Sequence, residues 1–518
     1  METLVMFIMN HPILTLFLGG IAFVLYKVLW EAKRREGLLI SPFSDTSAPN
    51  AYNQISGLKW SKISTLKTLF KEDKNRTLKI DNFAKYPSHA RRTSIFRQPF
   101  DKAEIYIEPK KLFEMMLLIS PMGGGKTVTF DSLLSQNFYD RAIINEEKAG
   151  DFTAKHLKKR RDIIHCPYDA RAHVWDLLSE PLPVIQGALE NLMAAILNGQ
   201  NGDNHFTSAA KEAYLSIARL TIEKDTTQGK WNCFIEELEK YFALVDAGDS
   251  KSKKDVVETM KHALNIFKLM RYQISRGKKT FTIKDFFAKK GGAKLFMVKN
   301  DLYSVELRCL FSAFYGAFIN THLSMPEFKI TKSTTFYAYD EYPSINLTME
   351  TRKKLHTKIR SKGGAVAIGC HYIDNDLEIQ NLMTSTVYAY FIFSVKNEKT
   401  KQWIENSVVG KRQYKVIEKN PKGEMVERTV ENPLIQWEDM NELKKDYLHL
   451  TVIPESNTLY VGKSDYIDLP EKVEPFIEED LTPFYINLNS DFRNSLNKFS
   501  TTKAAAEKYK KRDKKKED

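Results

Sequence analysis

The chain has 518 residues, enough for roughly two to four domains around a large core. Hydrophobic residues make up 42% and charged residues 28%, a globular composition that excludes wholesale disorder and a polytopic membrane protein. The net charge of +13 suits a nucleic-acid partner or an anionic membrane surface, and a solvated basic surface explains it almost as well.

Residues 3–26 carry no charged side chain and form a stretch long enough to span a bilayer once. Basic residues follow it, and the positive-inside rule places the chain after them in the cytoplasm: Lys27, Lys33, Arg34 and Arg35. The alternative is a cleaved signal peptide. In such a peptide, positive charges precede the apolar stretch, and a small-residue cleavage site follows it. We therefore expect residues 1–35 to form an uncleaved transmembrane anchor.

Residues 36–102 are polar and mixed, which predicts a membrane-proximal connector. Basic and aromatic side chains are interleaved near its end: Arg91, Arg92, Phe96, Arg97 and Phe100. The first strand is expected near residues 105–107. The four cysteines lie far apart, without a CxxC pair or zinc-ligand spacing, so the sequence implies no disulfide framework or metal knuckle and favours a reducing compartment: Cys166, Cys233, Cys309 and Cys370.

A glycine-rich loop follows an apolar run at residues 115–119 and precedes a helix-like segment from residue 128. Glycines let such a loop turn its N–H groups toward a polyphosphate. In a P-loop, Lys126 would reach the β- and γ-phosphates and Thr127 would offer its hydroxyl to Mg²⁺. Ser120 replaces the first glycine of the usual pattern, and a chance glycine-rich turn is the alternative. The predicted phosphate-binding residues are Ser120, Pro121, Met122, Gly123, Gly124, Gly125, Lys126 and Thr127.

Strand-like and helix-like segments alternate after this loop, with apolar runs at residues 142–144 and 163–166, which favours a parallel α/β sheet. From residue 184 to about 279, apolar residues instead recur at helical spacing, and strand-like runs stop. We therefore predict nucleotide-binding regions at 103–183 and 281–480, interrupted by an all-α domain at 184–280.

A second acidic element lies where an apolar, aromatic run at residues 334–339 ends in Asp340 and Glu341. A buried strand there would deliver two carboxylates to a nucleotide site. Asp340 would hold Mg²⁺ through its water shell, and Glu341 would polarise the attacking water. A solvated turn is the alternative. Further strand signals at residues 293–298, 365–369 and 387–393, with a hairpin over 414–430, complete this region.

The C-terminal residues 481–518 are predicted to be disordered. From residue 503 onward, Lys, Ala and acidic residues alternate, and the chain ends in a charged run. The run is either a solvated tail or a helix that grips a partner or nucleic acid.

With these elements placed, the chain resembles the coupling proteins of type IV secretion systems, the membrane-anchored hexameric motors of bacterial conjugation. The resemblance covers roughly residues 100–465 in the order of the family. Beyond the P-loop it rests on segments at 142–151, 162–171 with Trp175, 281–286, 340–344 and 359–364. It implies an α/β fold: a RecA-like P-loop NTPase domain with an inserted all-α domain and an N-terminal transmembrane helix.

The resemblance also implies ATP and Mg²⁺ as cofactors and two further catalytic residues. Arg360 occupies the place from which the family commonly supplies an arginine to the neighbouring subunit's nucleotide; a basic surface helix is the alternative. His371 stands where the family usually has a glutamine that senses the γ-phosphate; a core histidine is the alternative. Only one membrane helix is evident, whereas many members have two.

The function implied is an inner-membrane, single-pass ATPase with its bulk in the cytoplasm, assembled as a homo-oligomer that the family pattern makes a hexamer. It would recruit single-stranded DNA with a bound relaxase, or protein effectors, to inner-membrane components of the secretion system. A chromosome-pumping translocase would carry several membrane helices and a winged-helix module, and neither is evident. A membrane-bound adaptor with a weak or assembly-only nucleotide site is the alternative from another class.

Overall fold

The computed structural model describes most of the chain between residues 53 and 490. The described residues are 53–56, 58–60, 66, 78–85, 101–107, 111–136, 138–196, 205–248, 251–327, 334–345, 347–374, 376–419, 425–433, 435, 437, 443, 447–464 and 466–490. Within them, no helix is both long and apolar enough to cross a bilayer. The predicted anchor at residues 3–26, the basic patch at 91–97 and the charged C-terminal run lie outside the described residues.

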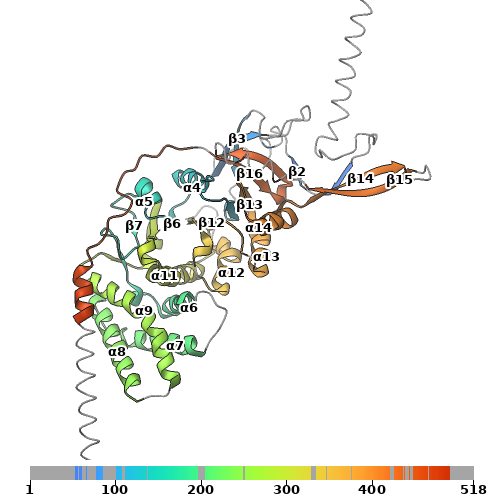
Figure 1. Ribbon diagram of the computed structural model, residues 1–518. Helices are drawn as coiled ribbons and strands as arrows, with labels where there is room; N and C mark the ends of the chain where they lie inside the picture. Colours follow the sequence, from blue (N-terminus) through green and yellow to red (C-terminus); the bar gives the residue numbers. More distant parts are fainter. Residues whose placement is uncertain are drawn as a thin grey trace, which may run out of the picture. The chain divides into compact units, whose positions relative to one another are not determined.

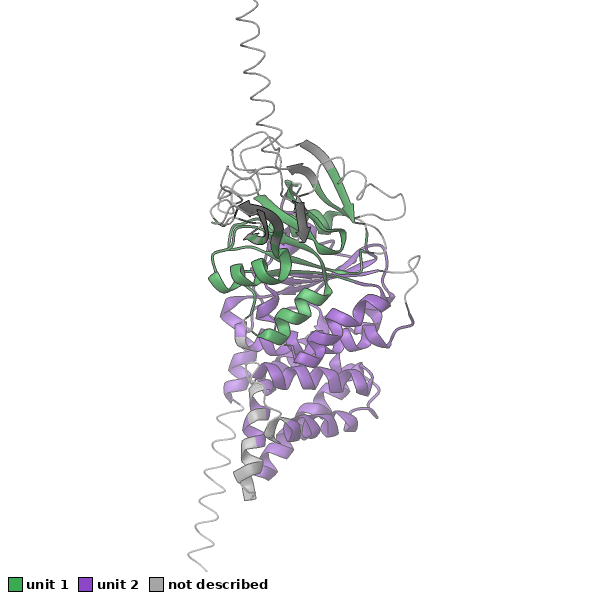
Figure 2. Ribbon diagram, turned by 90° about the vertical axis from the view of Figure 1, so that its right-hand side faces the viewer, with its two compact units in different colours: residues 1–138, 365–468 green, residues 139–364, 469–518 purple. Residues whose placement is uncertain are grey.

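The chain divides into two compact units, each made of two separate stretches of sequence. Unit 1 comprises residues 1–138 and 365–468, and unit 2 comprises residues 139–364 and 469–518 (Figure 2). The glycine-rich loop belongs to unit 1, whereas the acidic strand end belongs to unit 2.

Unit 1 is built on a mixed sheet in the order β4-β3-β17-β16-β13-β5-β12. Its strands are β3 (Leu78–Lys85), β4 (Asp101–Ile107), β5 (Met115–Ile119), β12 (Gly364–Cys370, from residue 365 onward in this unit), β13 (Val387–Ile392), β16 (Leu448–Ile453) and β17 (Thr458–Lys463). Strand β5 runs parallel to β12 and β13, and every residue of it is buried, which explains its unbroken apolar sequence. Strands β16, β17, β3 and β4 extend this core through antiparallel pairs.

In the described part of unit 1, α-helices and a separate small sheet accompany this mixed sheet (Figure 1). The helices are α4 (Lys126–Ser135), α13 (Leu377–Thr386) and α14 (Glu398–Trp403). The hairpin expected over residues 414–430 is confirmed, because β14 (Lys411–Lys419) pairs antiparallel with β15 (Met425–Pro433). Strand β1 (Asn53–Ser56) adds to the other edge of β14, giving a three-stranded sheet.

Unit 2 contains four parallel strands in the order β11-β6-β10-β7. They are β6 (Arg141–Glu146), β7 (Ile163–Ile164), β10 (Ala293–Val298) and β11 (Thr335–Tyr339). Helices α5 (Asp151–His156), α10 (Ile283–Ala288), α11 (Ser304–Ser324) and α12 (Met349–Thr357) connect or follow them. All residues of β6, β10 and β11 are buried, and because these strands are parallel, their carboxyl ends lie at one edge of the sheet, where open α/β sheets bind ligands.

Between the short strands β8 (Val174–Trp175) and β9 (Thr280–Phe281), the described chain contains only helices and turns. These helices are α6 (Leu182–Ile196), α7 (His205–Leu220), α8 (Thr227–Gly248) and α9 (Lys251–Ser275). Helix α6 approaches α11 closely, because a Cβ on Gly187 would lie 2.2 Å from the Asn320 side chain. The glycine therefore permits this helix-to-helix contact.

Three buried histidines and one half-buried histidine are expected to make the stability of unit 2 sensitive to acid. Burial lowers the pKa of His165, His322 and His356 to about 3 and that of His173 to about 4. These side chains stay neutral in the folded chain, while the unfolded chain takes up protons below about pH 6.5. We expect the melting temperature to fall as the pH is lowered from 7 to 5, as measured by thermal denaturation.

The variant His165→Phe provides the control for this effect. His165 lies among the rings of Trp175, Phe281 and Phe314, so a phenylalanine suits its surroundings. The variant should show a shallower acid slope than the parent. Glu146 acts in the opposite direction, because burial raises its pKa to about 8 and stability is lost as the pH rises from about 4.5 through 8. A melting temperature that is unchanged or higher at pH 5 would contradict the prediction.

Candidate nucleotide site

The glycine-rich loop of unit 1 turns sharply between the end of β5 and the start of α4. The Ser120 N–H donates to the Cys370 carbonyl at 3.0 Å, and the Gly124 N–H donates to the Pro121 carbonyl at 3.1 Å. The Ser120 hydroxyl folds into the turn and donates to the Pro121 carbonyl at 2.9 Å. A Cβ on Gly124 would lie 2.1 Å from that hydroxyl oxygen. Serine at position 120 is therefore accommodated because residue 124 is a glycine.

The far side of the loop is open and leads into the N-terminus of α4. Gly123 has φ 72°, and a Cβ there would meet no atom within 4 Å, while Met122 is 76% exposed. Gly125 caps the helix with φ 119°, and no side chain caps its first N–H groups. A Cβ on Gly125 would lie 2.8 Å from the ring of Phe393, so a larger residue would not fit. Uncapped N–H groups at a helix N-terminus favour an anion such as a phosphate.

Lys126 is only 7% exposed and lies against His371. The Lys126 ammonium is 3.2 Å from Nδ1 of His371, and the same nitrogen is 2.7 Å from the Ser120 carbonyl oxygen. Nδ1 can donate to the carbonyl when it carries a proton and can accept from the lysine when it does not. Nδ1 of the histidine therefore bonds either the loop backbone or the loop lysine, according to where the ring carries its proton. Thr127 follows in the first turn of α4 and is half-buried.

In unit 2, the strand that ends in the two carboxylates is β11, paired in parallel with β6. The Asp340 N–H donates to the Asn145 carbonyl at 3.2 Å, and the Asn145 side-chain amide donates back to the Asp340 carbonyl at 2.9 Å. Glu341 has φ 60°, a left-handed conformation that costs a non-glycine residue free energy and is common at functional sites. The strand end is thus fixed by β6, and the chain bends abruptly at Glu341.

The bend after β11 is held by Ser344. Its hydroxyl oxygen lies 2.8 Å from both the Glu341 carbonyl and Oε2 of Glu147. The other carboxylate oxygen of Glu147 pairs with the Lys299 ammonium. This chain of contacts connects the carboxyl ends of β6, β10 and β11. Asn145 and Ser344 thus position the carboxylates, although the sequence interpretation gave them no such role.

Arg360 lies in a short 3-10 helix, Ile359–Lys362, directly after α12. Ile359 is 1% exposed and anchors this turn, whereas Arg360 is exposed. Gly363, with φ 83°, ends the turn by donating its N–H to the Arg360 carbonyl at 3.0 Å. The turn therefore presents Arg360 at the surface of unit 2 on a firmly held backbone.

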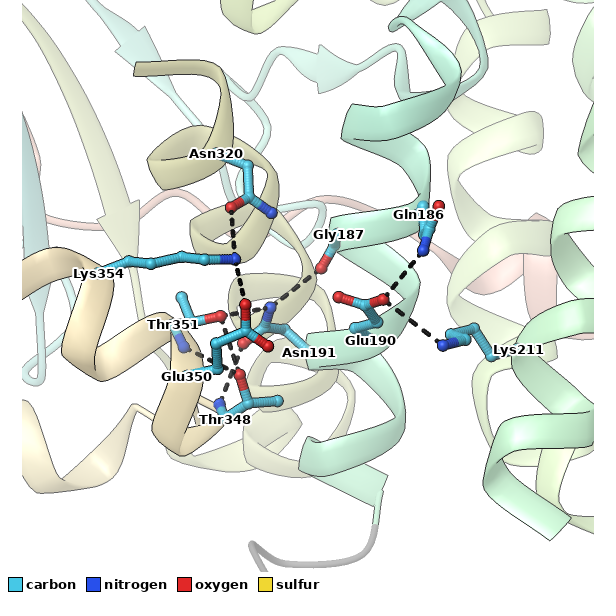
Figure 3. Close-up of polar contacts among 10 residues, drawn as sticks. All are labelled: Gln186, Gly187, Glu190, Asn191, Lys211, Asn320, Thr348, Glu350, Thr351 and Lys354. Carbon is cyan, nitrogen blue, oxygen red and sulfur yellow. Dashed lines mark hydrogen bonds and ion pairs between the residues drawn. The ribbon is translucent and has the colours of Figure 1, made fainter. Parts of the chain in front are cut away.

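Helix α12 is tied to α6 by the buried side chain of Asn191 (Figure 3). The Asn191 amide nitrogen donates to the Gly187 carbonyl at 3.0 Å and to the Thr351 hydroxyl at 3.1 Å. The Asn191 side-chain oxygen accepts the Thr348 N–H at 3.1 Å, directly at the N-terminus of α12. A Cβ on Gly316 would lie 2.2 Å from the Asn191 nitrogen, so α11 leaves a notch for this side chain. The helix before Arg360 is thereby locked to α6 and α11.

Lys354, one of the basic neighbours of Arg360, is engaged in the same region (Figure 3). Its ammonium lies 2.7 Å from Glu350 and 3.4 Å from the Asn320 side-chain oxygen. The segment is therefore not a uniformly basic face.

The predicted site residues form one cluster within each unit. In unit 1, Ser120, Lys126 and His371 meet around the loop, and in unit 2, Asp340 and Glu341 share the end of β11. The open loop, the uncapped helix and the buried lysine fit a triphosphate, and the carboxylate and hydroxyl oxygens are ligands that Mg²⁺ prefers.

Comparison with known families matches residues 100–428 to the type IV secretion-system coupling protein DNA-binding domain. No curated protein matches the chain. Among solved structures, the unbound monoclinic form of the bacterial conjugative coupling protein TrwBdeltaN70 aligns with a TM-score of 0.60 and 15% identity, covering 84% of this chain and 98% of that one.

Two nucleotide complexes of plasmid coupling protein TrwB align similarly. The complex with ADP and Mg²⁺ has a TM-score of 0.60 and 15% identity, and the complex with the non-hydrolysable ATP analogue ADPNP has 0.58 and 14%. Both alignments cover 84% of this chain and 100% of the other. At these identities the likeness shows the fold, which is TrwB-like and mixed α/β.

Proposed function

Because the chain belongs to the family of type IV secretion-system coupling proteins, we propose that it is a coupling ATPase that recruits a DNA–protein substrate to a secretion channel. One observation carries the proposal: the buried Lys126 stands at the uncapped N-terminus of α4, beneath an open glycine loop. That arrangement is what a polyphosphate requires. ATP hydrolysis drives transfer of the substrate.

The loop residues 120–127 hold the phosphates of ATP, with Lys126 on the β- and γ-phosphates. Thr127 and Asp340 hold Mg²⁺, which, when bound, neutralises charge on the phosphates. Glu341 orients the attacking water and accepts its proton on a carboxylate oxygen. His371 senses the γ-phosphate end of the site through its contact with Lys126. Arg360, from a neighbouring subunit, neutralises the charge that develops during transfer.

The RecA-like motor domain consists of residues 103–183 and 281–480, with an all-α domain at 184–280 between them. Residues 1–35 anchor the chain once in the bacterial inner membrane, and the bulk lies in the cytoplasm. The connector predicted at residues 36–102 gives way to β3, which joins the sheet of unit 1. Residues 481–518 form the tail. The subunits assemble as a hexamer, and the substrate is single-stranded DNA with a bound relaxase or a protein effector. The TrwB-like fold and the helices α6–α9 support this organisation.

Replacement of Lys126 by Ala tests the nucleotide site. Loss of a charged contact to a phosphate removes about 1.5–3 kcal/mol, so nucleotide affinity should fall roughly 10- to 150-fold. The measurement is titration with a fluorescent ATP analogue. Lys399→Ala, which changes an exposed lysine of α14 in the same unit, is the matched control and should bind normally. Undiminished binding by the Lys126 variant would reassign the loop.

A second candidate is an adaptor for protein effectors whose nucleotide site serves only assembly. The contact of His371 with Lys126 favours the adaptor, because the histidine engages the ammonium group that would otherwise contact the phosphate. ATP hydrolysis by the full chain, measured with and without single-stranded DNA, separates the two functions. If DNA still stimulates ATP hydrolysis as the salt concentration is raised, the protein is a motor, since nonspecific attraction to phosphates weakens with salt.

A further inference from the structure

A polar pocket of unit 2 lies at the carboxyl ends of β6 and β10, beside the N-terminus of α11. It has a volume of about 280 Å³. Six polar residues line it: Asn145, Lys299, Ser304, Arg308, Ser312 and Ser344. Asn145 and Ser344 also support the backbone of Asp340 and Glu341, whereas the nucleotide site gives no role to Ser304, Arg308 and Ser312.

Two donors in this pocket lack partners among the residues that the structure describes. Ser312 is 1% exposed, and its hydroxyl makes no hydrogen bond there. The Nε atom of Arg308 is buried and equally unpartnered within the described chain. A buried donor without an acceptor costs free energy, and native structures usually satisfy such groups. Both groups therefore point to a ligand that accepts hydrogen bonds.

The charges around the pocket favour an anion. Lys299 is compensated by its ion pair with Glu147, but Arg308 forms no ion pair with any described residue. Helix α11 begins at Ser304 and continues the 3-10 turn Asp301–Tyr303, which the Asn300 side chain caps, so the preference for an anion rests on Arg308. A cavity of about 280 Å³ has room for a phosphate group.

We propose that this pocket binds one phosphate group of the DNA backbone. The proposal rests on the proposed function and on the family, which is described as a DNA-binding domain. Arginine is well suited to phosphate, because its planar guanidinium donates two parallel hydrogen bonds. Free phosphate has the same chemistry as the backbone group, so the experiment must distinguish these two sources.

The pocket shares residues with the supports of the two carboxylates. The Ser344 hydroxyl contacts the Glu341 carbonyl, and the Asn145 amide contacts the Asp340 carbonyl. A phosphate held in the pocket therefore lies beside Asn145 and Ser344, which contact the backbone carbonyls of Asp340 and Glu341. DNA binding in the pocket can therefore change the position of the carboxylates at the end of β11.

The test measures binding of a fluorescent single-stranded oligonucleotide to the full chain by anisotropy over a salt series. Arg308→Gln should weaken binding roughly 10-fold and reduce the salt slope by about 0.7, the loss of one phosphate contact. Arg308→Lys, which keeps the charge, should recover part of the affinity. Arg219→Gln, at an exposed position of α7, is the matched control and should bind like the parent.

Ser312→Ala separates a ligand contact from a structural role. The change should weaken DNA binding roughly 3- to 10-fold, because it removes one hydrogen bond to the phosphate. It should not lower the melting temperature, because the hydroxyl has no partner within the described chain to lose. Parental affinity and salt slope in both the Arg308→Gln and Ser312→Ala variants would overturn the proposal.

A phosphate arm identifies the source of the anion. In the Lys126→Ala background, inorganic phosphate is titrated while the melting temperature is followed, with and without Arg308→Gln. If Arg308→Gln abolishes the phosphate shift but leaves DNA affinity unchanged, the pocket holds free phosphate and the DNA assignment is overturned. Nucleotide binding is measured in parallel. Its loss in Lys126→Ala, beside unaffected DNA binding by the pocket variants, would refute the pocket while leaving the proposed nucleotide site intact.

Discussion

Replacement of Glu341 by Gln is expected to slow ATP hydrolysis roughly 100- to 10,000-fold while bound nucleotide is retained. Glutamine has nearly the same size but cannot accept a proton at neutral pH, so only the proton-transfer step is lost. The backbone should be unaffected, because the bend at Glu341 is held by Ser344 through the main-chain carbonyl. Phosphate release and nucleotide affinity should be measured on the same preparation.

The control for this substitution is Glu327→Gln, at an exposed glutamate of unit 2 beyond the end of α11. It removes the same charge from the same unit and should hydrolyse ATP at the parental rate. A Glu341 variant that also hydrolyses at the parental rate would remove this residue from the role of base.

Replacement of Asp81 by Ala is expected to destabilise unit 1 by about 2–5 kcal/mol, because buried hydroxyl donors lose the acceptor that they bond. Asp81 and His449 are both fully buried, with Oδ1 of the aspartate 3.0 Å from Nε2 of the histidine. The other carboxylate oxygen accepts hydrogen bonds from the Tyr460 hydroxyl at 2.8 Å and the Thr451 hydroxyl at 3.2 Å. A Cβ on Gly462 would lie 2.4 Å from that oxygen, so the cluster is tightly enclosed.

The measurement is the free energy of unfolding in urea, compared with that of the variant Asp468→Ala. Asp468 is an exposed aspartate of the same unit, and its loss should change stability by no more than about 0.5 kcal/mol. His449→Ala and the double variant complete a cycle, in which the double variant should lose less than the sum of the single losses. Additive losses would show that the pair does not couple.

The parallel strands could be predicted from the sequence because each is a local signal. The runs at residues 142–144, 293–298 and 365–369 form β6, β10 and β12, as expected, since buried parallel strands are continuous apolar stretches. Three antiparallel strands of unit 1, β3, β16 and β17, were not predicted. Strands β16 and β17 escaped notice, and β3 lies in the segment interpreted as a connector. Their pairing is set by distant partners, which no local pattern reveals.

The site shows the same division between local and distant information. The residue types and spacing of the glycine loop indicated its conformation, and the end of β11 was correctly placed at residues 340 and 341. The contacts that hold these residues in place could not be predicted from the sequence. Phe393 lies against Gly125, and Asn145 holds the Asp340 backbone, because strands far apart in sequence meet there. Likewise, only coordinates show that the Ser120 hydroxyl takes the space above Gly124.

The Asn191 side chain, seated in the notch at Gly316, joins α6 to the N-terminus of α12. Separating these two helices would leave a buried amide without its partners, which costs about 1–3 kcal/mol for each stranded group. Since α12 leads directly into the turn that carries Arg360, the helical insertion and this arginine share one rigid connection.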